Sequence, residues 1–193
     1  MEVQVILISG RAGSGKTTTG NEMAEQLRLR GLCHAHIDCD NLDNIHPEEP
    51  GAEMLLANLR AMWSNYFHRR GITRLILSGT AVALEFESIR QAVKSASETL
   101  PDGAIGGQTG QAEMKEVKVE ARVVLLTAPD EVASQRLARR EVGSEITRML
   151  KSSKKMARVL EEAVGNWAMT VDTKGKDVTE TALHILRARG WVA

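Results

Sequence analysis

A glycine-rich segment near the N-terminus has the residue types and the spacing that bind nucleotide phosphates. Residues 10–17 read Gly-Arg-Ala-Gly-Ser-Gly-Lys-Thr and match the pattern G-x-x-x-x-G-K-[ST] at every fixed position. Glycines let backbone N–H groups converge on phosphate oxygens, and the start of a following helix adds a positive partial charge. In such a loop Lys16 reaches the β- and γ-phosphates and the Thr17 hydroxyl binds Mg²⁺. The segment predicts a nucleoside triphosphate site formed by Gly10, Arg11, Ala12, Gly13, Ser14, Gly15, Lys16, Thr17 and Thr18.

Two carboxylates, Asp38 and Asp40, follow the next predicted strand at i, i+2 spacing. A phosphotransferase needs one acid near the metal ion and one near the attacking hydroxyl. The third predicted strand ends in Ser78-Gly79-Thr80 without an aspartate, so Asp38 is the natural substitute as the acid beside the metal. Aspartate is also favoured in turns for its local hydrogen bonds, which leaves a solvated turn as the alternative. Gly79 lets an acceptor approach the backbone closely, or it serves a tight turn.

Three arginines lie on or just past the helix that follows the fourth predicted strand. Arg139 and Arg140 are candidates to close over the transferring phosphoryl group, with an ordinary solvated helix face as the alternative. We assign Arg136 to the solvated face, because phosphoryl transfer needs only a few such charges. After the fifth strand, the polar loop 172–176 contains Thr173 and is a candidate to hold a nucleotide base through its backbone.

The elements that must carry these residues alternate between strands and helices. Short β-branched apolar runs predict strands at 3–8, 34–38, 75–77, 117–126 and 168–171. Helical spacing and stop signals predict helices at 16–30, 52–70, 84–100, from 129 onward, at 145–164 and at 178–189. We expect a three-layer α/β/α fold with a five-stranded parallel sheet, because right-handed crossovers place helices on both faces. The glycine-rich segment 101–116 predicts a flexible loop.

Length and charge limit the class of protein. The 193 residues suit a single domain, 1–193, and the 25 basic and 25 acidic residues give zero net charge. Zero net charge argues against a general binder of nucleic acid or anionic membrane. The apolar run from Val5 to Ile8 is too short for a signal peptide or a membrane span, and two cysteines make no disulfide framework. We expect a cytoplasmic monomer or homodimer with no nucleic-acid or membrane partner.

With these residues placed, the chain resembles the small-molecule kinases of the nucleoside-monophosphate-kinase-like P-loop class. Shikimate and gluconate kinases are the most similar, and adenylylsulfate kinases come second. Besides residues 10–17, Asp38-Cys39-Asp40 looks like the D-x-D pair of shikimate kinases and the D-G-D of gluconate kinases, and His46-Pro47 is similar to a gluconate kinase feature. More closely, segments 36–40, 58–63 and 77–79 resemble a group of uncharacterised kinase-like P-loop ATPases.

The resemblance implies roles for the acid pair and for the nucleotide side of the site. In those kinases the first acid sits by Mg²⁺ and its water, and the second contacts the hydroxylated acceptor and is a candidate base. These roles fall to Asp38 and Asp40. Residues 137–139 look like the segment whose arginine packs on adenine, which would be Arg139, and the loop containing Thr173 looks like the one that touches the base.

The resemblance also implies a lid and an acceptor site. Arg140 would stand at the start of a short lid near 139–146. Arg60 is compared with a helix arginine that binds the acceptor carboxylate. The candidate substrate residues are therefore Asp40, Arg60 and Gly79. The other acceptor-binding residues of shikimate and gluconate kinases are not recognisable, so the identity of the acceptor stays open.

These observations predict a phosphotransferase that uses ATP and Mg²⁺ and moves the γ-phosphoryl group onto a hydroxyl or similar nucleophile of a small metabolite. The predicted catalytic residues are Lys16, Asp38, Asp40 and Arg140, and the predicted metal ligands are Thr17 and Asp38. One alternative is a nucleotide-dependent regulatory ATPase or switch that a protein partner reads. Another is a non-catalytic nucleotide-binding protein, which the missing aspartate after the third strand would suit.

Overall fold

The structure is a computed structural model that describes residues 1–48, 50–99, 116–140 and 146–193, with the backbone alone at residue 140. The predicted flexible loop 101–116 lies outside the described residues except for its last position. Residues 141–145 of the predicted lid, 139–146, lie outside them as well.

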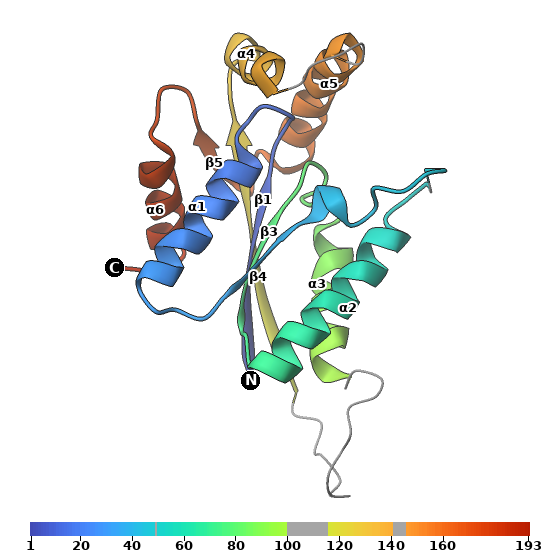
Figure 1. The fold of residues 1–193 in the computed structure, drawn as a ribbon, viewed down its shortest axis with the longest axis vertical. Coiled ribbons are helices and arrows are strands. Elements are labelled where there is room, and N and C mark those ends of the chain that lie inside the picture. Colours follow the sequence, from blue (N-terminus) through green and yellow to red (C-terminus); the bar gives the residue numbers. More distant parts are fainter. Residues whose placement is uncertain (49, 100–115, 141–145) are drawn as a thin grey trace, which may run out of the picture.

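Five strands form one parallel sheet in the order β2-β3-β1-β4-β5 (Figure 1). Their bounds are β1 Glu2–Ser9, β2 Ala35–Asp38, β3 Arg74–Ser78, β4 Lys118–Thr127 and β5 Met169–Asp172. In the registered pairs Ser78 lies opposite both Ile8 and Asp38, so these three strands end at the same edge of the sheet. The predicted five-stranded parallel sheet is confirmed.

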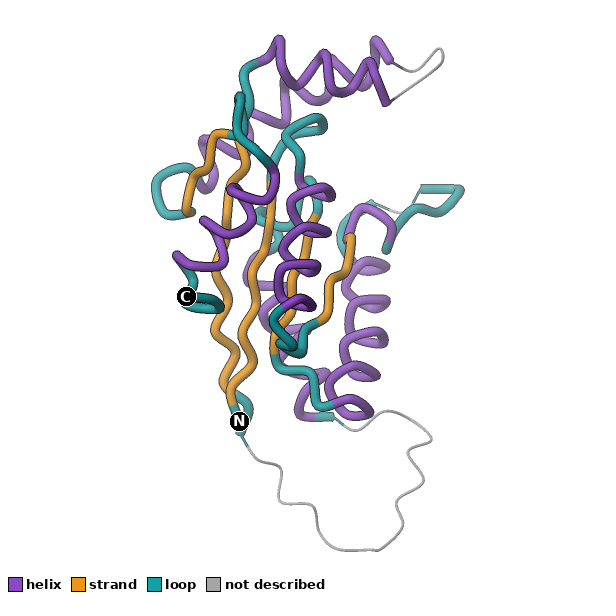
Figure 2. The backbone as a smooth tube through the Cα atoms, turned by 60° about the vertical axis from the view of Figure 1, so that its left-hand side comes forward, coloured by secondary structure: helices purple, strands orange, loops and turns teal. Residues whose placement is uncertain are grey.

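Helices cover both faces of the sheet, as the backbone view in Figure 2 shows. The helices are α1 Lys16–Leu29, α2 Glu53–Arg70, α3 Phe86–Glu98, α4 Asp130–Arg140, α5 Ile146–Val164 and α6 Val178–Ala188, and a short 3₁₀ helix, η1, spans Cys39–Asn41. Apolar residues of α2, α3 and α5 pack on one face of the sheet, and those of α1 and α6 pack on the other. The predicted α/β/α layering is therefore confirmed.

The two cores explain why these segments take the structure they do. β1 has apolar side chains pointing to both faces, and from Val5 to Ile8 they are nearly inaccessible to solvent, as expected for a strand covered on both sides. In α2 the buried residues Leu55, Leu59 and Trp63 recur every fourth residue and face the sheet. The predicted helix 84–100 is shorter in the structure, because a turn in which Leu84 N–H donates to the carbonyl of Ala81 precedes α3.

The topology opens a crevice beside the first strand. β1 and β3 are neighbours, yet α1, which follows β1, and α3, which follows β3, pack on opposite faces. The chain therefore leaves the carboxyl ends of β1 and β3 toward opposite faces of the sheet. Ligands of open α/β sheets bind at such a point. Figure 1 shows α4 and the start of α5 beyond the same edge of the sheet. None of the described helices is long and apolar enough to cross a membrane.

Candidate functional site

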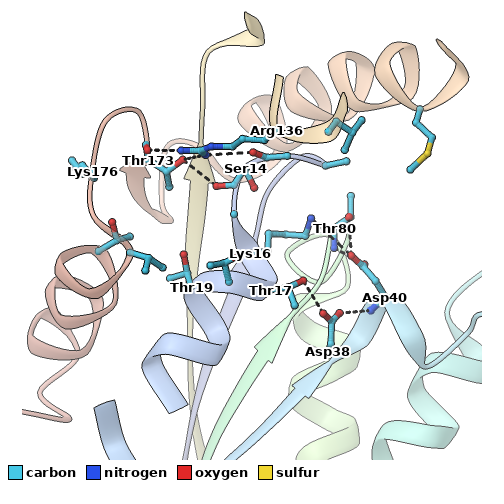
Figure 3. Close-up of a pocket in the computed structure, with 18 of the residues that line it drawn as sticks. Ser14, Lys16, Thr17, Thr19, Asp38, Asp40, Thr80, Arg136, Thr173 and Lys176 are labelled. Atoms are coloured by element: carbon cyan, nitrogen blue, oxygen red, sulfur yellow. Dashed lines mark hydrogen bonds and ion pairs between the residues drawn. The ribbon is translucent and has the colours of Figure 1, made fainter. Parts of the chain in front are cut away.

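A cavity of about 530 Å³ lies at this crevice. The phosphate-loop residues from Ala12 to Thr18 form its floor. Figure 3 shows Asp38, Asp40 and Thr80 on one side of the loop and Arg136, Thr173 and Lys176 on the other. The structure thus brings the predicted loop, the acid pair and the loop after β5 into one site.

The loop adopts a conformation that depends on close contact with α4. Gly13 has φ of +83°, and a Cβ atom at this position would lie 2.4 Å from the carbonyl oxygen of Ala133. The loop ends at Lys16, the first residue of α1, whose side chain is only 7% exposed. Lys16 Nζ donates to the carbonyl oxygen of Arg11 at 3.4 Å and lies 3.8 Å from Asp40 Oδ2. The ammonium group is therefore held inside the cavity, at the loop and beside the second acid.

Thr17 and Asp38, the predicted metal ligands, lie together in the cavity wall. Thr17 Oγ1 donates to Asp38 Oδ2 at 2.8 Å, and Asp38 Oδ1 accepts from the backbone N–H of Asp40 at 3.2 Å (Figure 3). A hydroxyl and one carboxylate are hard oxygen ligands, and Mg²⁺ in phosphate-binding sites uses one or two carboxylates plus waters and substrate phosphates. The pair fits a Mg²⁺ ion that arrives with a nucleotide. The described residues hold no group of three or more His, Cys, Asp or Glu side chains that could bind a metal by themselves.

Asp40 is oriented but accessible. Its Oδ1 accepts from the backbone N–H of Thr80 at 2.7 Å, and its Oδ2 accepts from the Thr80 hydroxyl at 3.1 Å. Its side chain is 47% exposed. Two donors and the nearby Lys16 ammonium fix the carboxylate without covering it, so it can receive a hydrogen bond from a bound molecule.

Gly79 lies behind the acid pair and not in the cavity wall. A Cβ atom there would lie 2.7 Å from Val82 Cγ1 and 3.1 Å from Cys39 Cβ. Glycine at this position lets the end of β3 pack closely against η1, which carries Asp40. The structure therefore assigns Gly79 a packing contact, whereas the sequence also allowed an acceptor contact.

Two of the predicted arginines lie away from the cavity. Arg60 is exposed on α2 and Arg139 is exposed on α4, and neither contributes to the wall. The side chain of Arg140 lies outside the described residues. The side chain of Arg11 turns away from the cavity although its backbone belongs to the phosphate loop, and it is bonded to Ser153 and Asp130.

Arg136, which the sequence analysis assigned to a solvated face, lines the cavity instead. Its two terminal nitrogens each donate to Thr173 at 2.9 Å, one to the hydroxyl and one to the carbonyl oxygen, and one of them lies 3.4 Å from the carbonyl oxygen of Gly13. The signal was available in the helical spacing. Ala133 and Leu137 are apolar and mark the buried face of α4, and position 136 lies beside that face whereas position 139 does not.

Thr173 joins the loop after β5 to the phosphate loop. It is buried, and its hydroxyl lies 3.0 Å from the carbonyl oxygen of Ser14 and 3.1 Å from that of Thr127. Lys176 and Val178 extend this wall of the cavity. The sequence singled out Thr173 for a backbone contact with a base, and the structure adds that its side chain braces the site.

Burial shifts the pKa of two titratable groups beside the acid pair. Burial lowers the pKa of His36 below its usual value, an effect that Asp38 opposes and His34 reinforces. His36 Nε2 lies 3.0 Å from Oγ of Ser78, the last residue of β3. Burial is also the main cause that raises the pKa of the Cys39 thiol, and Asp40, Asp38 and Asp43 add to it. Cys39 is therefore a neutral side chain between the two acids.

The comparison with protein families gives one match that spans most of the chain. The sequence model of the Zeta toxin family matches residues 3–179. No curated protein sequence matches the chain.

Solved structures of small-molecule kinases share the fold. Shikimate kinase from Acinetobacter baumannii in complex with shikimate is 17% identical, with a TM-score of 0.57 over 99% of this chain and 94% of that one. A gluconokinase from Sinorhizobium meliloti 1021 is 14% identical, with a TM-score of 0.55 over 97% and 95% of the two chains. The APS kinase of Mycobacterium tuberculosis in complex with AMPPNP and APS is 14% identical, with a TM-score of 0.54 over 97% and 98%. At these identities the likeness establishes a kinase-like P-loop fold.

Proposed function

The chain belongs to the Zeta toxin family, and from that membership and the geometry of the cavity we propose that it is an ATP- and Mg²⁺-dependent phosphotransferase. It moves the γ-phosphoryl group onto a hydroxyl, or a similar nucleophile, of a small metabolite. One observation carries the proposal: two carboxylates with different partners, Asp38 on Thr17 and Asp40 on Thr80, flank the cavity beside Lys16. Phosphoryl transfer needs this division between a metal side and an acceptor side.

The phosphate loop binds the nucleotide. Its backbone N–H groups hold the phosphates, and Lys16 moves from the Arg11 carbonyl to the β- and γ-phosphate oxygens, where its charge is needed. Thr17 and Asp38 would hold Mg²⁺, which would neutralise charge on the transferring phosphoryl group. The APS kinase that shares the fold was solved with AMPPNP, which supports ATP as the donor.

Asp40 orients the acceptor and accepts its proton. The acceptor oxygen attacks the γ-phosphorus, the bond from that phosphorus to the bridging oxygen of ADP breaks, and the hydroxyl proton passes to the Asp40 carboxylate. The two hydrogen bonds from Thr80 keep this carboxylate in position. Catalysis of this kind comes mainly from positioning and from stabilisation of charge.

The remaining predicted residues have narrower roles in the proposal. Arg136 and Thr173 form the wall beside the nucleotide, and Arg139 contributes to that side once nucleotide is bound. Arg140 supplies a cation to the phosphoryl group. Arg60 and Gly79 keep an acceptor role only as predictions from the sequence, because neither lines the cavity. The shikimate complex supports a small hydroxylated acceptor, and the cysteine usage and zero net charge support a cytoplasmic enzyme without nucleic-acid partners.

The direct test is ADP release from Mg-ATP, measured alone and with pools of sugars, sugar acids, nucleosides, amino alcohols and hydroxy acids. We expect one pool to stimulate release. Lys16→Ala should nearly abolish turnover without unfolding the protein, because removing a preorganised charge at the phosphates costs orders of magnitude in rate. Asp40→Asn should lower acceptor-dependent release far more than nucleotide binding.

Equal effects of Asp40→Asn on nucleotide binding and on acceptor-dependent release would contradict its acceptor role. Slow ADP release that no pool of candidate acceptors stimulates, together with tight nucleotide binding, would favour the regulatory ATPase or switch. Unchanged turnover in Lys16→Ala would contradict the assignment of the nucleotide site.

A further inference from the structure

Arg11 belongs to the phosphate loop, yet its side chain leaves the nucleotide cavity and is 4% exposed. Its Nε donates to Ser153 Oγ of α5 at 2.9 Å, and one terminal nitrogen forms an ion pair with Asp130, the first residue of α4. A guanidinium buried without partners is strongly unfavourable. The conformation of Arg11 is therefore tied to the positions of α4 and α5.

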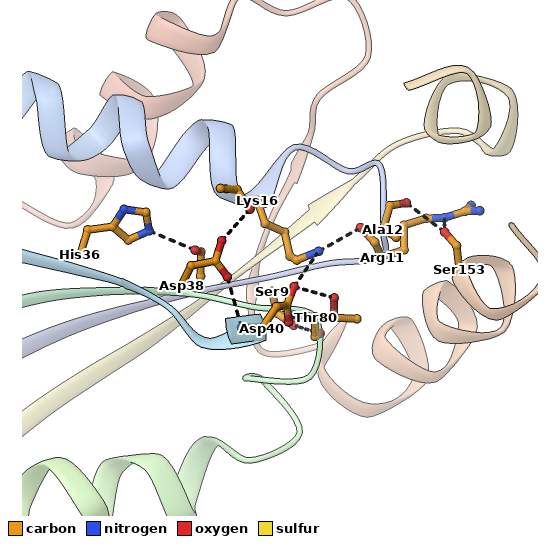
Figure 4. A network of polar contacts seen from close by, with 11 residues as sticks. Ser9, Arg11, Ala12, Lys16, His36, Asp38, Asp40, Thr80 and Ser153 are labelled. Carbon is orange, nitrogen blue, oxygen red and sulfur yellow. Dashed lines mark hydrogen bonds and ion pairs between the residues drawn. The ribbon is translucent and has the colours of Figure 1, made fainter. Parts of the chain in front are cut away.

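The backbone of the loop is held by the same two helices. Ser153 Oγ donates to the carbonyl oxygen of Ala12 at 2.9 Å, as Figure 4 shows beside its bond with Arg11. Gly13 packs on the carbonyl of Ala133, where a Cβ atom would lie 2.4 Å from the oxygen. Three consecutive loop residues thus contact α4 or α5, and the loop cannot shift without disturbing those contacts.

The carbonyl oxygen of Arg11 faces the other way, toward the phosphate-binding lysine. Lys16 Nζ donates to it at 3.4 Å, and the backbone N–H of Ser14 donates to it at 3.1 Å. A phosphate group in the loop competes for both donors. Arg11 is therefore linked through its carbonyl to the groups that bind phosphate and through its side chain to α4 and α5.

The contact with the two helices extends to the wall of the cavity. Asp130 is also bonded by Lys154 of α5 at 3.3 Å, so one carboxylate joins the phosphate loop, α4 and α5. The hydrogen bonds from Arg11 and Lys154 hold the pKa of Asp130 below its usual value, which keeps it ionised at neutral pH. Met149 lies one helical turn before Ser153 on α5 and lines the cavity.

We propose that Arg11 is a positioning residue that couples nucleotide binding in loop 10–17 to the order of α5. A bound nucleotide fixes the loop backbone, and the Arg11 contacts with Asp130 and Ser153 transmit that restraint to the helix that carries Met149. By linkage, disorder in α5 weakens nucleotide binding by the same factor. The inference rests on the nucleotide-binding part of the proposed function and not on phosphoryl transfer.

Hydrogen exchange of the full chain, with and without Mg²⁺ and a non-hydrolysable ATP analogue, tests this coupling. In the wild type, the analogue should slow exchange in peptides from the phosphate loop and from α5. In Asp130→Asn and in Ser153→Ala the analogue should still slow hydrogen exchange in the loop. The factor by which it slows exchange in α5 should fall about tenfold, the loss expected for one charge-assisted hydrogen bond. Combining Arg11→Met with Asp130→Asn should add little to either variant alone, because both remove the same contact.

The control is Glu87→Gln, which breaks an ion pair of the same kind with Arg90 on α3, at 2.6 Å and away from the cavity. It should behave as the wild type. Because Asp130→Asn leaves a buried cation unpaired and can lower Tm, Arg11→Lys is the second variant. It keeps the charge but cannot bond Asp130 and Ser153 together, and it should give an intermediate slowing of α5.

Three results would overturn the inference. If the analogue slows hydrogen exchange in α5 of Asp130→Asn and Arg11→Lys as much as in the wild type, and also slows it in the loop, the coupling is overturned and the nucleotide site stays intact. If these variants have a lower Tm but the analogue slows exchange in α5 as in the wild type, Arg11 has only a structural role. No slowing in the loop of the wild-type protein would overturn the nucleotide site and the coupling together.

Discussion

At the scale of single residues, the chemistry depends on how neighbouring acids are kept distinct. Asp38 and Asp40 are two residues apart, yet Asp38 bonds the Thr17 hydroxyl and Asp40 bonds the backbone and hydroxyl of Thr80. They separate because the chain leaves strand geometry after Asp38: η1 begins immediately after β2 and turns Asp40 toward Thr80. The spacing of the two acids predicted two roles, but it could not show which donor would hold the second one.

The arginines show where prediction from sequence stopped at this scale. The cations 136, 139 and 140 share one short helix, and the apolar residues Ala133 and Leu137 place position 136 beside its buried face, but this spacing does not show that the buried face meets the cavity. Arg136 was therefore misassigned to solvent. Arg11 shows the same limit, because its position in the phosphate-binding pattern describes its backbone and leaves the direction of its side chain open.

His36 gives a prediction about acid stability. Burial lowers its pKa in the folded protein, so below about pH 6.5 the unfolded chain binds the proton more readily than the folded one. The free energy of unfolding should therefore fall as the pH decreases from 7.5 to 5.5, and His36→Asn should show a smaller fall. Urea denaturation at both pH values measures the difference. Identical pH dependences in the wild type and the variant would contradict the assignment.

At the scale of elements, the phosphate loop, α1 and the ends of three strands assemble the site from local signals. The strand, loop and helix order around residues 10–17 was predictable because β-branched residues, glycines and helix formers follow one another there. The contacts of α4 with the loop were not, since they depend on packing between residues more than 100 positions apart, such as Gly13 and Ala133.

The pairing of α2 with α3 gives a prediction about stability. Trp63 of α2 is fully buried, and its Nε1 donates to Ser97 Oγ of α3 at 2.8 Å. Ser97→Ala leaves that N–H buried without an acceptor, so it should lower the free energy of unfolding by about 1–3 kcal/mol. Ser95→Ala on the same helix is the matched control and should change it by less than about 0.5 kcal/mol, because the Ser95 hydroxyl bonds the carbonyl of Ala92 within its own helix. Equal losses in the two variants, measured by urea denaturation, would argue against the Trp63 bond.

At the scale of the whole molecule, the five-stranded parallel sheet agrees with what the alternation of strands and helices predicted, and the family match agrees with the resemblance to P-loop kinases. The order β2-β3-β1-β4-β5 places the phosphate loop at the centre of the sheet, where the acid pair approaches from one side and the loop after β5 from the other. Sequence alone could predict the layers, since they follow from periodicity. It could not predict the acceptor, because recognition depends on surfaces contributed by several distant segments.

Nucleotide binding should stabilise the whole fold. At a Mg²⁺-nucleotide concentration about 100-fold above Kd, a ligand that binds only the folded chain adds about 2.7 kcal/mol. For a domain of this size, that gain raises Tm by about 5–10 °C. Thermal unfolding with a non-hydrolysable ATP analogue measures the shift, and Lys16→Ala should lose most of it. An equal shift in the variant would place the binding outside the phosphate loop.

The most direct test of phosphoryl transfer follows the γ-phosphate itself. The protein would be incubated with ATP labelled in the γ-phosphate and a low-mass metabolite extract, and the labelled products separated by chromatography and identified by mass spectrometry. We predict that label appears in a small phosphorylated metabolite and that Asp40→Asn, which keeps the phosphate loop, fails to form it. Label that passes only into inorganic phosphate, at the same rate with and without the extract, would contradict a kinase and identify the protein as a nucleotide hydrolase.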